Sequence, residues 1–181
     1  MLILTSGDSE ETTHPQRENT THDSTRPETN VYSLVALVFM TIVAAITTSV
    51  HFLVLTVGPQ IASAGAPWAP YVFSFTWPSV LYALDILAWD WFFALSLFFA
   101  SFVFTDGTLE RAVRVLLLVS AGLSLAGLLG VPLADMHVRN IGIVGYAVVS
   151  PIAFLLIALV FGRDRTTPNA AEQHQDTQAV A

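Results

Sequence analysis

Four long runs of apolar, almost uncharged residues dominate this chain and decide the kind of fold that it can adopt. They cover residues 31–57, 80–104, 113–131 and 141–161. Each run is close to the roughly 20 residues that a helix needs to cross a bilayer. Charged residues make up 12% of the chain, whereas a soluble domain carries about 25% to solvate its surface. We therefore predict an all-α fold, a bundle of four transmembrane helices.

Helix-boundary residues agree with these limits. Asn30 can cap the first helix, and Pro78 stands near the first turn of the second, where proline is tolerated. Gly130 and Pro132 close the third helix. Pro151 lies inside the fourth and should kink it, because proline removes a backbone hydrogen bond.

Arginines indicate the orientation of the bundle in the cell membrane. With four spans, six of the seven basic residues fall on one side, and only Arg139 falls on the other. The positive-inside rule therefore puts both termini in the cytoplasm. Residues 1–30 form an acidic tail and residues 162–181 a short polar tail, and their composition predicts disorder in both.

The longest connection, residues 58–79, lies on the outer side in this topology. Its glycines and prolines argue against regular structure. Tyr71, Phe73, Phe75 and Trp77 alternate along it. They fit either an aromatic belt at the level of the lipid headgroups or a lid over a pocket between the helices.

Ionisable residues within the spans are the most informative feature for function, because a charge in mid-membrane costs on the order of 3 kcal/mol. His51, Asp85 and Asp90 are such residues. At about 1.5 Å of rise per residue, His51, Asp85 and Tyr146 share one level in the outer half of the membrane. The next level inward holds four more polar residues, Thr47, Asp90, Ser124 and Ser150. We call these seven residues the polar slab, and every span contributes to it.

Two interpretations of the polar slab stay open. It is either a ligand or reaction site, built on an interacting pair of His51 and Asp85, or polar glue that joins helices by hydrogen bonds. Asp85 and Asp90 are five residues apart, so they differ by about 140° around an α-helix. They cannot face one centre unless the helix is distorted. The spacing of His51, Asp85 and Asp90 matches no known metal-ligand motif, so we predict no metal and no cofactor.

A second polar group lies on the outer loop, residues 132–140. Asp135 and Arg139 are four apart, which favours a local ion pair. His137 is either an exposed loop residue or a ligand, and Asn140 can cap the fourth span.

Small residues are frequent in the third and fourth spans. Ser120 and Ser124, like Ala126 and Gly130, have the spacing that lets helices approach closely. We expect these residues to pack helices together, within the bundle or between protomers.

Three segments carry a resemblance to a known family. They are residues 73–79 (FSFTWPS), 83–90 (ALDILAWD) and 140–149 (NIGIVGYAVV). They resemble a family of small four-helix prokaryotic membrane proteins without an assigned activity, so the resemblance implies topology and no particular chemistry. The chain is also loosely similar to four-helix sterol-isomerase-type and ligand-binding membrane proteins, which is an architectural analogy only.

Three classes of function follow from these patterns. The first is binding of a lipid or small molecule in the polar slab, with enzymatic acid–base chemistry left open. The second is a non-catalytic subunit or scaffold that assembles with itself or a membrane partner through the glycine-rich helices. The third is a proton-coupled transporter, which the apolar inner half disfavours. We expect the protein to lie in the lipid bilayer, and we do not expect it to bind nucleic acid.

Overall fold

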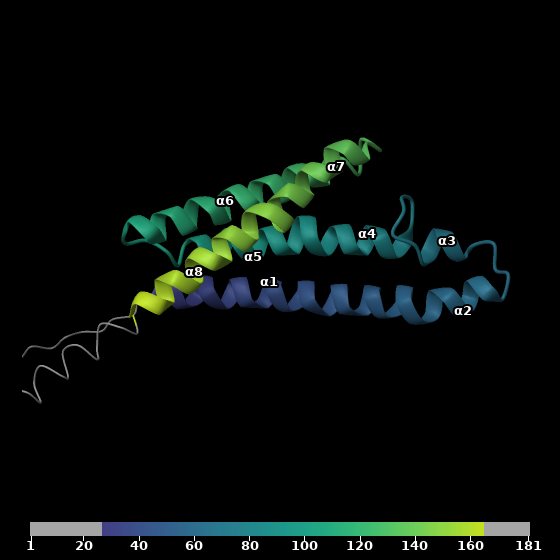
Figure 1. Cartoon of the computed structure of the whole chain (residues 1–181), viewed down its shortest axis with the longest axis horizontal. Helices are drawn as coiled ribbons and strands as arrows, with labels where there is room; N and C mark the ends of the chain where they lie inside the picture. The colour runs from purple at the N-terminus through teal and green to yellow at the C-terminus, as the bar shows by residue number, and fades with distance from the viewer. Residues whose placement is uncertain (1–26, 165–181) are drawn as a thin grey trace, which may run out of the picture.

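Helices form the whole framework of the computed structural model, which describes residues 27–164 (Figure 1). No strand occurs in this range. Three of the helical segments are π-helical, labelled η. In chain order the segments are α1 (Pro27–Phe52), η1 (Leu53–Val57), α2 (Gly58–Ser63), α3 (Ala69–Val72), α4 (Val80–Ile86), η2 (Leu87–Phe92), α5 (Phe93–Ser101), α6 (Thr108–Leu128), α7 (Met136–Ile143), η3 (Val144–Val149) and α8 (Ser150–Asp164).

Joined end to end, these segments give four helices that are long and apolar enough to cross a membrane. They are Thr29–Ser63, Val80–Ser101, Thr108–Leu128 and Met136–Gly162, and we call them spans one to four. Large apolar side chains remain exposed on them, such as Leu55 and Leu155. This surface suits lipid better than water. The prediction of four apolar helices in an all-α chain is confirmed, and the fold is compatible with a multi-pass membrane protein.

Each span packs mainly against the spans next to it in the sequence. Span one runs beside span two, and span three packs against both span two and span four (Figure 1). One end of the bundle carries α2, α3 and the turn 129–135, and we call it the α3 end. The core is a cluster of nine buried apolar residues, Val43, Phe93, Ala94, Leu97, Val113, Leu117, Ala121, Ala153 and Val160.

Span one differs from its prediction at both ends. Helix α1 begins at Pro27, so Asn30 lies inside the helix and does not cap it. The helix also continues through η1 and α2 to Ser63, into the segment predicted to be irregular. Pro59 does not stop it. It directly follows the π-turn η1, in which Gly58 donates its backbone N–H to the carbonyl of Leu53. The short helix α3 lies in the same segment.

Spans two to four also shift by a few residues. Span two ends at Ser101 rather than 104, and span three covers 108–128 rather than 113–131. Span four begins at Met136 rather than 141, because Asp135 and not Asn140 is its N-cap. Most of the predicted disordered tails lies outside the described residues, but residues 27–30 and 162–164 belong to helices.

Three wide π-helical turns interrupt the α-helical pattern. A π-turn uses i→i+5 hydrogen bonds, is rare, and is frequent at functional sites. Two of the three contain residues of the polar slab, since Asp90 lies in η2 and Tyr146 in η3. The third, η1, begins two residues after His51. Pro151, which was predicted to kink the fourth span, lies in the first turn of α8, directly after η3.

Candidate functional site

An ion pair between Asp90 and Arg139 lies at the centre of the site. Asp90 comes from η2 of span two and Arg139 from α7 of span four. Their side chains are 0% and 3% exposed, and Nε of Arg139 is 3.5 Å from Oδ2 of Asp90. The guanidinium also lies over the rings of Tyr82 and Tyr146, 5.4 and 5.9 Å from their centroids. A buried cation is therefore held by one carboxylate and two aromatic faces.

The N-cap of α7 positions Arg139. One carboxylate oxygen of Asp135 accepts hydrogen bonds from the backbone N–H groups of His137 at 2.8 Å and Val138 at 3.4 Å. Because this cap starts the helix before Arg139, the arginine lies one turn inside the bundle. The predicted local ion pair between Asp135 and Arg139 is wrong. The Asp135 carboxylate caps the helix, and Arg139 pairs with a carboxylate in another span.

Glycines allow α7 to approach Asp90 closely. A Cβ atom at Gly142 would overlap Oδ1 of Asp90, and one at Gly127 would overlap the backbone of Gly142. A Cβ atom at Gly130 would likewise overlap the backbone of Arg139. Gly127, Gly130 and Gly142 therefore pack inside the bundle, which is one of the two arrangements that the sequence left open.

The π-turn η2 begins between Asp85 and Asp90 and contains Asp90, so the wider turn changes their relative direction. The sequence predicted that the two carboxylates could face one centre only if the helix were distorted, and η2 is that distortion. Both carboxylates are close enough to Arg139, and to each other, to interact electrostatically. Asp85 differs from Asp90 in being only partly buried. We call Asp85, Asp90, Arg139 and Tyr146 the charged cluster.

Several buried polar atoms, in the charged cluster and outside it, have no hydrogen-bond partner. Within residues 27–164 they are Thr47 Oγ1, Asp85 Oδ1, Asp90 Oδ1, Asp90 Oδ2, Ser124 Oγ and Arg139 Nε. All four spans contribute one or more of them. Elsewhere, buried hydroxyls are bonded. Ser96 donates to the carbonyl of Ala36 at 2.8 Å, and Ser101 to that of Phe98 at 2.6 Å.

His51 lies at the edge of this arrangement. Its side chain is exposed, and its Nδ1 is hydrogen-bonded to the Thr47 carbonyl of its own helix at 2.8 Å. It interacts electrostatically with Asp85, but the two form no ion pair within the described residues. Phe75 of the long connection packs on the His51 ring, at 5.2 Å between centroids, and on the Tyr82 ring at 6.4 Å.

The remaining predicted site residues have separate positions. The Ser150 hydroxyl donates to the backbone carbonyl of Tyr146 at 2.6 Å, so it is satisfied within its own helix. His137 is exposed at the start of α7. Sequence reasoning placed Arg139 in a loop and so missed it as the partner of Asp90. One sequence feature could have identified Arg139 as a functional residue. In the predicted topology, it is the one arginine that falls on the outer side.

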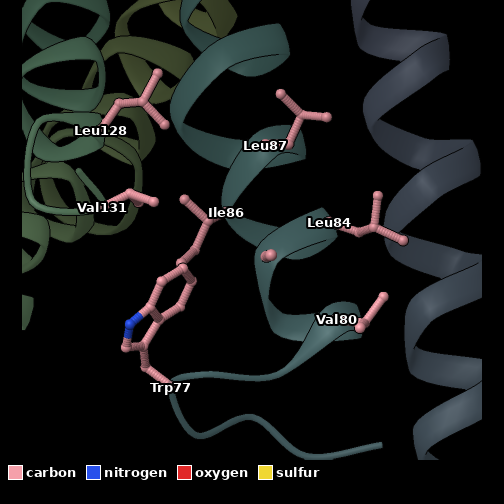
Figure 2. A pocket seen from close by; sticks show the side chains of 8 residues that line it. Trp77, Val80, Leu84, Ile86, Leu87, Leu128 and Val131 are labelled. Atoms are coloured by element: carbon pink, nitrogen blue, oxygen red, sulfur yellow. The ribbon is translucent and has the colours of Figure 1, made fainter. Parts of the chain in front are cut away.

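An apolar groove of about 510 Å³ lies at the α3 end, between span two and the end of span three. Figure 2 shows Trp77 and Ile86 of the span-two side pointing toward Leu128 and Val131 across the groove. Asp90 follows Ile86 by four residues, inside the π-turn η2, and is not one of the residues that line the groove. The complete lining is Trp77, Val80, Ala83, Leu84, Ile86, Leu87, Leu128 and Val131.

Comparisons of the chain with protein-family models, with curated proteins and with solved structures gave no match. The class of protein therefore rests on the fold and the site. Within residues 27–164 the protein is all-helical and has four membrane-compatible helices, and a buried charged cluster joins spans two and four.

Proposed function

We propose that this protein binds a lipid or another small amphiphile within the membrane. The polar head lies at the charged cluster, and the apolar part lies in the groove at the α3 end. The observation that carries the proposal is the set of buried polar atoms without hydrogen-bond partners, to which all four spans contribute. Each buried polar group without a partner costs about 1–3 kcal/mol, so a polar head that bonds several of them gains affinity from each.

The groove supplies the second half of such a site. Its lining residues are apolar, and most of them belong to spans two and three or to the turn that follows span three. A surface groove at this position is covered by lipid chains once the helices span a bilayer. An acyl chain in the groove would contact Ile86, which precedes Asp90 by four residues along span two.

The proposal includes the orientation inferred from the arginines. Arg111 and Arg114 lie at the end of the bundle opposite the α3 end, whereas Arg139 lies near the α3 end. The positive-inside rule then puts both termini in the cytoplasm of a cell whose membrane holds the protein. The charged cluster and the groove lie in the outer half of that membrane. The family resemblance carried by residues 73–79, 83–90 and 140–149 remains part of the same proposal.

The two other functions have less support. Assembly through glycine-rich helices was the basis for a scaffold, but Gly127, Gly130 and Gly142 are occupied by contacts inside the bundle. A proton-coupled transporter needs access to the site from both sides. Toward the other end of the bundle, the buried hydroxyls of Ser96 and Ser101 are bonded and the core is apolar.

Filling the groove tests the proposal. The protein would be purified in a mild nonionic detergent and analysed by native mass spectrometry, with extraction and identification of bound lipids. The wild type should retain a small molecule, and Ala83→Phe should lose it because Ala83 lines the groove. Ala44→Phe, on the exposed surface of α1, is the matched control and should retain it. A wild type free of any small molecule, or equal retention by Ala83→Phe, would contradict the proposal.

A further inference from the structure

We infer that the polar head that this site recognises is a protonated amine and that Asp85 anchors it. The inference rests on the proposed function, which it extends from binding of an amphiphile to the chemistry of its head. It starts from the charges of the cluster, where two carboxylates share one permanent cation, Arg139. Arg139 is the ion-pair partner of Asp90. Asp85 is the second carboxylate of the cluster, and it has no ion-pair partner within residues 27–164.

The surroundings of Asp85 leave it open to a donor. The ionisable groups that interact with it electrostatically are His51 of α1, Asp90 of η2, Arg139 of α7 and Tyr146 of η3. His51 uses Nδ1 for the Thr47 carbonyl of its own helix. Trp89 is the hydrogen-bonding neighbour of the Asp85 carboxyl group, yet Oδ1 is buried without a partner. A buried carboxylate oxygen gains most from a charged donor, since charge-assisted hydrogen bonds are the strong ones.

Aromatic rings around Asp85 favour a cation. Tyr82 precedes it by three residues and Trp89 follows it by four, so both lie on its side of the helix. Tyr146 packs on Trp89, with 5.2 Å between ring centroids. Rings beside a carboxylate are the usual means of recognising an ammonium group. Arg139 already lies over Tyr82 and Tyr146, so these rings hold one cation in this structure.

Other head chemistries fit the site less well. An anionic head would meet two carboxylates and only one arginine. For a metal ion, residues 27–164 hold no cluster of three histidine or acidic side chains that could bind one. A second observation points to a polar ligand independently of the carboxylates. Ser124 of α6 is fully buried and its hydroxyl has no partner, beside the segment that carries Gly142 and Gly145.

Three amphiphiles of one chain length test the inference. Dodecylammonium, dodecanol and dodecanoate would be titrated into the full-length protein in nonionic detergent, with the shift in melting temperature giving an apparent Kd. Dodecylammonium should bind at least about tenfold more tightly than the other two. Asp85→Asn should weaken its binding by roughly ten- to a hundredfold, as expected for loss of one charge-assisted hydrogen bond. Asp106→Asn, in the exposed turn between α5 and α6, is the matched control.

The outcomes separate this inference from the function on which it rests. Equal binding of the three probes, unaffected by Asp85→Asn, would overturn the inference that the head group is an amine. It would leave the proposal of amphiphile binding intact. Binding of none of them, together with a wild type free of small molecules, would overturn both. Asp85→Glu should keep amine binding, which separates loss of charge from loss of fold. Displacement of dodecylammonium by ethylammonium would assign the site to a soluble amine, whereas displacement only by lysophosphatidylethanolamine would assign it to a lipid headgroup.

Discussion

Arg139 and Asp90 face each other across spans four and two, with 3.5 Å between Nε and Oδ2, and both side chains are almost completely buried. Neither the Nε nor either carboxylate oxygen makes a hydrogen bond within the described residues. The pair is therefore held by charge and by the aromatic faces around the guanidinium. In such a setting each charge depends on the other, because removal of one leaves the second uncompensated in a medium of low polarity.

Arg139→Gln should lower the free energy of unfolding by about 3–5 kcal/mol, the usual cost of leaving one partner of a buried ion pair alone. SDS titration of the protein in mixed micelles would measure it. Asp90→Asn should have a similar effect, and the double variant should be less damaged than the sum of the two. Arg111→Gln, on an exposed residue of α6, should change stability little. Additive effects of Arg139→Gln and Asp90→Asn would show that the two residues do not interact.

Gly142→Ala should destabilise the bundle, because a Cβ atom at this position would overlap Oδ1 of Asp90. Overpacking of this kind costs about 1–3 kcal/mol, which a thermal unfolding curve in detergent would detect. Gly122→Ala is the matched control in a neighbouring span, since a Cβ atom there would have nothing within 4 Å. A melting temperature that falls equally in both variants would argue against the close approach of α7 and Asp90.

His51→Gln and Asp85→Asn should be non-additive when they are combined, since the two side chains interact electrostatically. The coupling should exceed the 0.3–0.5 kcal/mol within which independent sites add. It should remain smaller than that of Arg139 and Asp90, because the His51 side chain is exposed and its Nδ1 is engaged by Thr47. The four unfolding free energies of a double-mutant cycle give the coupling directly. Strict additivity would mean that the predicted pair does not exist.

Single introduced cysteines should reveal the orientation, since the native chain has no cysteine. Ala64 lies in the connection at the α3 end, and Asp106 lies in the turn at the opposite end, both exposed. In intact cells an impermeant maleimide should label the cysteine of Ala64→Cys. It should label that of Asp106→Cys only after the membrane is permeabilised. The reverse pattern would place both termini outside.

The sequence predicts only some of the residues that line the groove. Trp77 was recognised as one of the alternating aromatics of the long connection, and the structure gives it a place beside Ile86 and Val131. Phe75, from the same set, instead lies against His51 and Tyr82. The alternation identified an aromatic segment, but which ring packs on which helix depends on how the connection folds back between spans one and two.

The sequence by itself determined the four apolar helices, whereas the membrane level of the polar slab stays a prediction. Both depend on local properties, since the length of an apolar run and the rise per residue fix where Thr47, Asp85 and Ser124 lie along their helices. It also identified the requirement for a distortion between Asp85 and Asp90. Hydropathy did not reveal that Met136–Asn140 is helical, because this segment is polar and its helix is set by the cap at Asp135.

Only the tertiary structure decided how the helices pair and which polar groups meet. The direction of a side chain around its helix depends on packing, and a π-turn such as η2 redirects every residue that follows it. Arg139 could reach Asp90 only because Gly142 and Gly127 let two helices approach without side chains between them. That contact joins segments far apart in the chain, so no local pattern encodes it, and the favoured local partner, Asp135, was the wrong one.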